Sequence, residues 1–256
     1  MPEGDTIWRT ATALRDALLD RPVVAVRPAA LGRLVGHRVV AVHPVGKHLY
    51  MTFDTGVVLH THMRMTGAWH LYRRGEPWRR VAHRATAVLD FDEVQAVLFA
   101  APTCELIGLG EVGFGLGPDI LAEGFDIAEV AARARRSRRR TIAEVLLDQH
   151  VCAGIGNMYR CDALWYEGID PLAAIDSLSD AAVARVYLRA RDLLRRGSVA
   201  DGFRPHVAVH GRSGRPCRNC GSLIEARSLG RPSRILFWCP RCQSANAVSR
   251  REAPIG

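Results

Sequence analysis

The chain has 256 residues, 48% hydrophobic and 24% charged, which is an ordinary composition for a folded protein. No apolar run approaches the ~20 residues of a membrane helix, and the N-terminus lacks the layout of a signal peptide, so we expect a cytoplasmic protein with no membrane partner. The net charge is −1 over residues 1–126 and +10 over residues 127–256, which favours nucleic acid as a partner over an anionic membrane surface, with a merely solubilising surface as the alternative.

The first half of the chain predicts one helix followed by many short strands. Apolar residues at helical spacing, behind an Asp or Thr N-cap, predict an amphipathic helix over residues 5–20. Beyond it, β-branched runs predict strands at 22–27, 38–45, 48–53, 57–63, 67–73, 85–91 and 95–99. The segments "FDTGVV" (53–58) and "DFDEVQ" (90–95) predict hairpin turns. Strands with no helices between them indicate an antiparallel sandwich or barrel.

The second half of the chain predicts helices and then a small cysteine-bearing module. A glycine-rich linker, "GLGEVGFGLGPD" (108–119), precedes helical patterns at 126–135, 141–149, 155–168 and 179–196. We therefore expect four parts: an N-terminal domain (1–115), a helical domain (116–205), a cysteine module (206–245) and a flexible tail (246–256).

Lys47 stands out in the composition because it is the only lysine among 35 basic residues. An arginine guanidinium, with a pKa above ~12, cannot give up and take back protons as an amine can. The remaining lysine is therefore a candidate for chemistry, and chance survival is the alternative.

Two CxxC pairs near the C-terminus predict a zinc site. Cys217 and Cys220 are separated by eighteen residues from Cys239 and Cys242, which provides four thiolates at a spacing suited to tetrahedral Zn²⁺. A reducing compartment disfavours disulfides, and a redox CxxC does not come as a matched pair. Two apolar stretches around a Gly-Arg-Pro turn predict a zinc-bound β-hairpin with Arg234 near its tip. Such hairpins bind nucleic acid, protein or nothing.

The three other cysteines are predicted to be structural, and a glycine-containing turn is a candidate phosphate-binding site. Cys104, Cys152 and Cys161 lie in apolar settings and are predicted to be buried thiols. In "AGIGN" (153–157) two helical stretches meet, and Asn157 stands where the second one starts. Helix N-termini of this kind hold phosphates, although a simple αα-corner would give the same pattern.

Several motifs occur in one order along the chain. They are "MPEG" at the start, "GKHLYM" (46–51), "THMRMTGAW" (61–69), "LGPDIL" (116–121), "LLDQHVCAGIGNMY" (146–159) and the four-cysteine hairpin with "RILFWC". Together they resemble the formamidopyrimidine-DNA glycosylase and endonuclease VIII family of DNA repair enzymes, over nearly the whole chain. The resemblance implies a multidomain α+β fold, with an N-terminal catalytic β-sandwich flanked by helices, a helix-two-turn-helix DNA-binding domain and a C-terminal zinc-finger β-hairpin.

The resemblance also implies catalytic roles. Removal of the initiator methionine leaves Pro2 as an N-terminal secondary amine, which attacks C1′ of a damaged nucleoside as the nucleophile. Glu3 matches the general acid that protonates the sugar ring oxygen, and Lys47 matches the lysine of base excision and β-elimination. Arg234 matches the hairpin arginine of δ-elimination and phosphate binding, and Asn157 matches the asparagine that grips phosphate.

Base flipping leaves a hole in the duplex that inserted side chains fill. Met65 matches the position of the family's void-filling residue, although taken alone it reads as a core methionine, and Arg64 beside it is a further DNA-binding candidate. The resemblance implies damaged double-stranded DNA as the partner and one structural Zn²⁺, and we expect no nucleotide cofactor, a monomer and a bacterial-type location with the DNA.

Departures from the family pattern narrow the expected substrate. "APTCELIGLG" (101–110) lacks the Arg and Phe of the 8-oxoguanine branch, and residues 195–214 are too short for that branch's capping loop. The endonuclease VIII branch, which acts on oxidised pyrimidines, is therefore favoured. Thr6 occupies a position where the family often has a second Glu. This chain therefore lacks that second carboxylate, unless Asp5 replaces it. The alternatives are an 8-oxoguanine glycosylase and a non-catalytic or lyase-only protein that binds damaged DNA.

Overall fold

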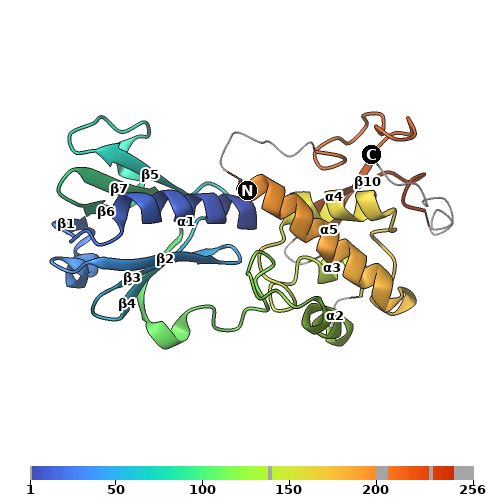
Figure 1. Ribbon diagram of the computed structural model, residues 1–256. Coiled ribbons are helices and arrows are strands. Elements are labelled where there is room, and N and C mark those ends of the chain that lie inside the picture. The colour runs from blue at the N-terminus through green and yellow to red at the C-terminus, as the bar shows by residue number, and fades with distance from the viewer. Residues whose placement is uncertain (1, 138–139, 200–206, 231–232, 245–256) are drawn as a thin grey trace. The chain divides into compact units, whose positions relative to one another are not determined.

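The computed structural model describes residues 2–137, 140–199, 207–230 and 233–244, which divide into one unit at Met1–Gly115 and a second at Leu116–Gly256 (Figure 1). The expected flexible tail (246–256) lies outside the described residues. Within the described ranges, no helix has the length and apolar character needed to cross a membrane.

The first unit contains two four-stranded antiparallel sheets. One consists, in spatial order, of β1 (Ala25–Arg27), β6 (Ala85–Asp90), β7 (Val94–Phe99) and β5 (Ala68–Arg73). The other consists of β2 (Val39–Val45), β3 (His48–Phe53), β4 (Val57–His62) and β8 (Thr103–Gly108). The predicted turns join β3 to β4 and β6 to β7. The predicted β-sandwich is confirmed.

Two features of this unit differ from the prediction. The strand predicted over 22–27 shortens to β1, and a 3₁₀ helix, η1 (Ala29–Leu34), follows it. The sequence does not predict β8, because none of its six residues is buried and so the alternation that marks a half-buried strand is weak.

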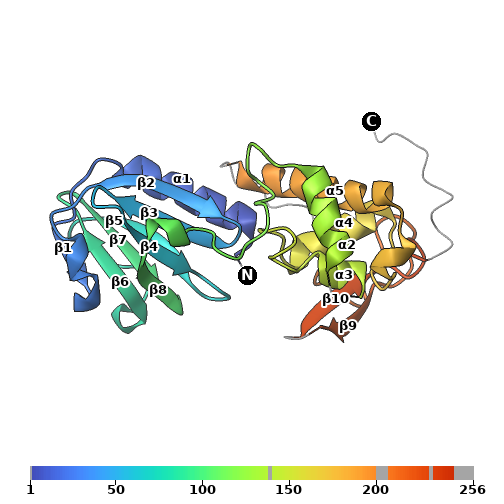
Figure 2. The same cartoon turned by 90° about the horizontal axis from the view of Figure 1, so that it is seen from below.

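Helix α1 (Gly4–Leu18) contributes to the core of the sandwich and packs mainly against β2 (Figures 1 and 2). Its buried apolar residues recur every three or four positions, which places them in one stripe facing the sheets: Ile7, Ala11, Leu14 and Leu18. Burying each of its three large side chains, Ile7, Leu14 and Leu18, contributes roughly 1.5–3 kcal/mol, so this stripe fixes the start of the chain against the sandwich.

The second unit is helical, and its long helices lie where the sequence predicts. It contains α2 (Ile127–Arg136), α3 (Ile142–Val145), α4 (Asn157–Glu167), the 3₁₀ helix η4 (Ile175–Ser177) and α5 (Asp180–Ser198). Helix α5 packs against both α4 and α2. Asp126 and Ser179 accept backbone N–H bonds at the starts of α2 and α5, which satisfies donors that a helix leaves unpaired.

The helix predicted over 141–149 is wrong in length, because only the turn α3 is helical. Gln149 provides the reason. Its Nε2 donates to the carbonyls of Leu147 (2.9 Å) and Ile155 (3.1 Å), and its Oε1 accepts from the N–H of Gly154 (3.1 Å). The side-chain amide thus replaces helical backbone partners and holds two successive turns between α3 and α4.

The chain then forms an antiparallel hairpin of β9 (Glu225–Leu229) and β10 (Arg234–Trp238), and β10 packs against α4. Arg234 pairs with Leu229 at the turn end of the ladder, so its predicted position near the hairpin tip is confirmed. The predicted multidomain α+β architecture holds.

Candidate functional site

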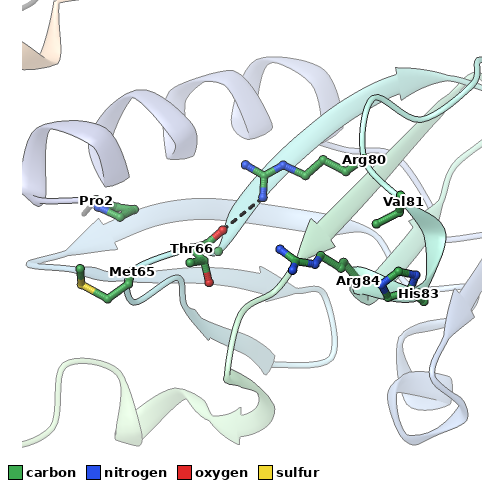
Figure 3. A pocket seen from close by; sticks show the side chains of 8 residues that line it. Pro2, Met65, Thr66, Arg80, Val81, His83 and Arg84 are labelled. Atoms are coloured by element: carbon green, nitrogen blue, oxygen red, sulfur yellow. Dashed lines mark hydrogen bonds between the residues drawn. The ribbon is translucent and has the colours of Figure 1, made fainter.

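Pro2 lines an open pocket of about 730 Å³ in the first unit (Figure 3). The other lining residues are Met65, Thr66, Gly67, Arg80, Val81, His83 and Arg84. They come from the segment after β4 and from the connection between β5 and β6. No carboxylate is among these lining residues, so the side chains around Pro2 favour an anionic ligand.

Glu3 follows Pro2 directly and is the residue that precedes helix α1. It is 4% exposed, and its carbonyl accepts the Ile7 N–H at 3.1 Å, so the start of the helix fixes its backbone. Pro2 and Glu3, the predicted nucleophile and acid, are therefore adjacent in the chain, and the start of α1 fixes the direction of this short segment.

Asp5, the candidate to replace the carboxylate that is missing at Thr6, lies in the first turn of α1. Asp5 is 4% exposed, lies 3.7 Å from the Arg9 guanidinium in an ion pair and accepts a hydrogen bond from Thr6 Oγ1 at 3.4 Å. Asp5 is thus engaged inside the first turn of α1 and is not among the residues that line the pocket.

A tight loop presents Met65 to solvent. The Gly67 N–H donates to the Met63 carbonyl at 2.8 Å, and Met63 is buried. Arg64 adopts φ +49, a left-handed conformation that costs a non-glycine residue about 1 kcal/mol. Met65 is 58% exposed, so the reading of it as a core methionine is wrong.

Arg80, His83 and Arg84 form a basic wall that the sequence interpretation did not include. The Arg80 guanidinium donates to the Thr66 carbonyl at 3.1 Å, and Figure 3 shows Arg84 also extending toward Thr66. The run "RRVAHR" (79–84) was the available signal, but only the fold shows that it faces Pro2.

Lys47 occupies the two-residue turn between β2 and β3, closed by the pair Val45 and His48. Gly46 beside it has φ +60, as such tight turns require. Lys47 is half-buried and is not among the residues that line the Pro2 pocket.

Histidines surround the turn that carries Lys47. His48 Nδ1 lies 2.8 Å from His60 Nε2, and the rings of His48 and His62 meet edge-on at 4.6 Å. Burial is the main reason that the pKa of His48 falls to about 3 and that of His62 to about 4. The charges of Arg64 and Lys47 lower both values further, so both rings are neutral at physiological pH.

In the second unit, Asn157 contacts the hairpin strand β10, which also carries Arg234. Asn157 begins α4, and its Nδ2 donates to the Ile235 carbonyl at 2.8 Å, next to Arg234. The amide is held from its other side by Arg160, whose guanidinium donates to Asn157 Oδ1. Arg160 is 1% exposed, so a buried cation fixes the orientation of Asn157.

The four predicted ligand cysteines come together. The ligand sulfurs of Cys217, Cys220, Cys239 and Cys242 all lie within 4.8 Å of one another. The Sγ atoms are 3.8 Å apart for Cys217–Cys242 and 3.4 Å apart for Cys220–Cys239. Tetrahedral Zn²⁺ with Zn–S bonds of ~2.3 Å needs sulfurs nearly 4 Å apart, so this cluster fits such an ion.

Two buried polar side chains attach the cysteine module to the helices. Asp162 on α4 accepts backbone N–H bonds from Ala208, Val209 and His210 at 3.0, 3.0 and 3.2 Å. Gln243 accepts the Cys239 N–H at 2.9 Å and donates to the Ile169 carbonyl at 3.1 Å. Neither role was visible in the sequence, because each depends on which backbone groups the module brings to α4.

The remaining cysteines are poor nucleophiles. Burial raises the pKa of Cys104 and of Cys161 to about 11, and raises that of Cys152 further. Cys152 and Cys161 are buried as predicted, whereas Cys104 on β8 is only half-buried.

Comparisons with known proteins agree with this arrangement. Residues 1–103 match the formamidopyrimidine-DNA glycosylase N-terminal domain, and residues 116–204 match the formamidopyrimidine-DNA glycosylase H2TH domain. The chain is 34% identical to the probable endonuclease 8 2 of Streptomyces coelicolor, over 96% of this chain and 95% of that one. It is also 34% identical to the DNA-(apurinic or apyrimidinic site) lyase Nei2 of Mycolicibacterium smegmatis, over 96% of this chain and 100% of that one.

A solved structure supports the fold. The Lactococcus lactis formamidopyrimidine-DNA glycosylase bound non-covalently to DNA with an abasic site superposes with a TM-score of 0.83, at 20% identity, over 95% of this chain and 100% of that one. The domain matches, the full-length relatives and the shared fold together establish that the chain belongs to the formamidopyrimidine-DNA glycosylase and endonuclease VIII family.

Proposed function

We propose that this chain excises oxidised pyrimidines from double-stranded DNA through an N-terminal proline Schiff base and then cleaves the strand by β,δ-elimination. Family membership makes it a DNA glycosylase and DNA-(apurinic or apyrimidinic site) lyase of base excision repair.

The proposed nucleophile is the amine of Pro2. An N-terminal α-amino group has a pKa of ~8, so a usable fraction is neutral at physiological pH, whereas an ordinary lysine at ~10.4 is almost wholly protonated. Attack on C1′ expels the base, and the secondary amine leaves a positively charged iminium. That iminium withdraws electrons from the sugar and favours elimination of the phosphate.

Glu3 and Lys47 are the proposed proton-transfer groups. Glu3 is adjacent to the proposed nucleophile and buried, which supports it as the group that protonates the sugar ring oxygen as the base leaves. Lys47 provides the amine that assists base excision and removes a proton in β-elimination.

The proposed DNA contacts divide between the units. Asn157 and Arg234, joined through Ile235, hold a backbone phosphate in the second unit, and Arg234 also takes part in δ-elimination. Met65, exposed at the tip of its loop with Arg64 beside it, fills the space left by the flipped nucleotide.

We assign one structural Zn²⁺ to Cys217, Cys220, Cys239 and Cys242. These residues would hold the ion as thiolates, and when bound it would supply a cross-link that stabilises the hairpin carrying Arg234.

The observation that carries the proposal is Pro2 at a pocket with an exposed methionine and a basic wall. Borohydride should trap a covalent complex between the protein and an abasic-site oligonucleotide, with the adduct mapped to the N-terminal peptide by mass spectrometry. Glu3→Gln keeps the amine and should still trap a preformed abasic site while failing to release a base. Pro2→Gly should trap less, and trapping equal to that of the wild type would reject Pro2 as the nucleophile.

The lesion class is tested separately. Duplexes carrying thymine glycol should be cleaved faster than duplexes carrying 8-oxoguanine. The reverse order would place the chain with the 8-oxoguanine enzymes, and binding without cleavage of either would favour a lyase-only or non-catalytic protein.

A further inference from the structure

The strand register places one aromatic ring between the loop that carries Met65 and the basic wall. Phe99, at the end of β7, is opposite Ala68 of β5 and Ala85 of β6. The Met65 loop (residues 63–67) ends directly before Ala68, and the basic wall ends directly before Ala85. Both of these pocket-lining segments therefore join the sheet on either side of Phe99.

Arg80 packs on this ring from the side of the wall. Its guanidinium lies over the Phe99 ring, 6.0 Å from the ring centroid, in a cation–π contact. The ring itself is fixed, because Phe99 is fully buried and the rings of His70 and Trp78 meet it edge-on at 5.2 and 5.6 Å. Arg80 is half-buried, whereas the other two residues of the wall are exposed. This packing limits where the Arg80 guanidinium can lie.

From this position Arg80 reaches the Met65 loop. Its Nη1 donates to the Thr66 carbonyl at 3.1 Å, along the dashed line in Figure 3. Thr66 directly follows Met65, so the bond holds the backbone beside the exposed methionine. Within the loop, the Gly67 N–H donates to the Met63 carbonyl, which closes the turn without joining it to another segment. The Arg80 bond is what attaches this turn to the wall.

We propose that Arg80 is a positioning residue for Met65, because it clamps the Thr66 carbonyl and so presents the methionine before the protein meets a duplex. The proposal rests on the function proposed above, in which Met65 fills the space left by the flipped nucleotide. A loop that is already held in its exposed conformation loses less conformational entropy on insertion. More of its contact energy then favours the flipped state.

The clamp is compatible with a phosphate contact by the same side chain. A guanidinium carries five N–H donors in a planar fork, and the bond to the Thr66 carbonyl uses one of them. A DNA phosphate can therefore bind Arg80 while the clamp stays closed. Such a phosphate would lie beside the Met65 loop, which links backbone contact to the placement of the methionine.

Arg79 provides a matched control, because it has the same chemistry one residue earlier. Its guanidinium lies over the Tyr72 ring, 5.6 Å from the centroid, and its backbone N–H donates to the Tyr72 hydroxyl at 3.1 Å. Arg79 is not among the residues that line the Pro2 pocket. Arg79→Gln therefore removes a stacked cation from the same connection and leaves the clamp intact.

The first test is spectroscopic and needs no substrate. The full chain is labelled with ¹³C at the methionine methyl carbons, and Met65→Leu assigns the Met65 signal. Arg80→Gln, whose side chain is two bonds shorter, should lower the order parameter of the Met65 methyl group, and Arg79→Gln should keep the wild-type value. The methyl group of Met51, fully buried in the core, should be unchanged in both variants and shows that they are folded. An unchanged Met65 order parameter in Arg80→Gln would overturn the clamp.

The second test is a double-mutant cycle on base release, measured in single turnover at saturating protein concentration. On a duplex carrying thymine glycol, Arg80→Gln should slow release by about fivefold, the effect of losing one hydrogen bond. In the Met65→Ala background it should have little further effect, because the clamp then holds no side chain that can fill the void. Arg79→Gln should follow its parent protein in both backgrounds.

The outcomes separate the two proposals. If Arg80→Gln caused an equal loss in both backgrounds, the positioning role would be rejected and the proposed function would stand. If Met65→Ala released the base as fast as the wild type, both the void-filling role and its positioning by Arg80 would be overturned, while borohydride trapping would still show whether Pro2 is the nucleophile. If the wild type trapped no abasic DNA, the proposed function would fail, and the methyl spectra would decide whether Arg80 holds the loop.

Discussion

At the scale of single residues, Gly67 determines how Met65 is presented. A Cβ at Gly67 would lie 2.5 Å from the Met63 carbonyl oxygen and 2.8 Å from its Cα, and neither backbone atom can move aside easily. We expect Gly67→Ala to lower the free energy of unfolding by about 1–3 kcal/mol, measured by urea denaturation. Gly32→Ala, where an added Cβ meets nothing within 4 Å, should change it by less than ~0.5 kcal/mol.

Met65 itself should matter only where a base must leave a duplex. We expect Met65→Ala to slow base release from a paired oxidised pyrimidine by about tenfold, because the void left by the flipped base stays empty. Cleavage of an abasic site in single-stranded DNA should be unchanged, since no stack is broken there. An equal loss on both substrates would mean that Met65 supports the loop rather than filling the void.

The histidines near Lys47 make stability depend on pH. Their folded pKa values, about 3 for His48 and about 4 for His62, lie below the unfolded value of 6.5. The unfolded chain therefore binds more protons between these values, and stability is fully present above pH 6.5 and lost as the pH falls toward 4. In urea titrations from pH 8 to pH 5, His48→Gln should show a shallower loss than the wild type. Parallel curves would contradict the low pKa of His48.

The sequence could nominate residues of unusual chemistry, but it could not predict contacts that depend on strand register. Pro2 and Lys47 stand out in the sequence because an N-terminal amine and a sole lysine are chemically unlike their alternatives. His48, His60 and Glu105 are ordinary strand residues in the sequence, and they meet only because β3, β4 and β8 pair in one register. Since the sequence does not predict β8, it could not place Glu105 beside a histidine.

At the scale of elements, the cysteine hairpin should depend on its metal while the sandwich does not. We expect Cys239→Ser to lose zinc, measured by elemental analysis, and to lose most DNA affinity, because the hairpin carrying Arg234 loses its cross-link. Amide hydrogen exchange should still show protected strands in the first unit. Cys104→Ser, a half-buried thiol on β8, is the control and should retain the metal.

The elements also show where periodicity stops being informative. Apolar spacing correctly predicts α2 and α5, since each buries one stripe, and it also predicts α4, which is buried on all sides over residues 159–165. The same spacing runs on through residues 146–149, where the Gln149 amide takes over the backbone hydrogen bonds and ends α3. A single side chain that competes with the backbone leaves no mark in a hydrophobic pattern.

At the scale of the whole molecule, the division between Gly115 and Leu116 changes the net charge that is assigned to each part of the chain. It assigns Asp119, Glu123 and Asp126 to the second unit, so the units carry net charges of +2 and +7 rather than the −1 and +10 of the two halves. Both units are therefore basic. The basic wall beside Pro2 accounts for part of the charge in the first unit and predicts that this unit also contacts DNA phosphates.

The salt dependence of DNA affinity, measured on the intact chain, tests whether the first unit contacts DNA phosphates. Each phosphate contact in B-DNA adds about 0.9 to the slope of log affinity against log salt, through counterion release. We expect the double variant Arg80→Gln and Arg84→Gln to lower this slope by about 1–2 for abasic duplex DNA. Arg33→Gln, which removes an exposed charge of the same unit outside the pocket lining, should leave the slope unchanged.

If the double variant and Arg33→Gln altered the slope equally, the basic wall would contribute only to the net charge of the unit. A selective effect would instead place a DNA phosphate beside Pro2, where the sugar must lie for the amine to reach it.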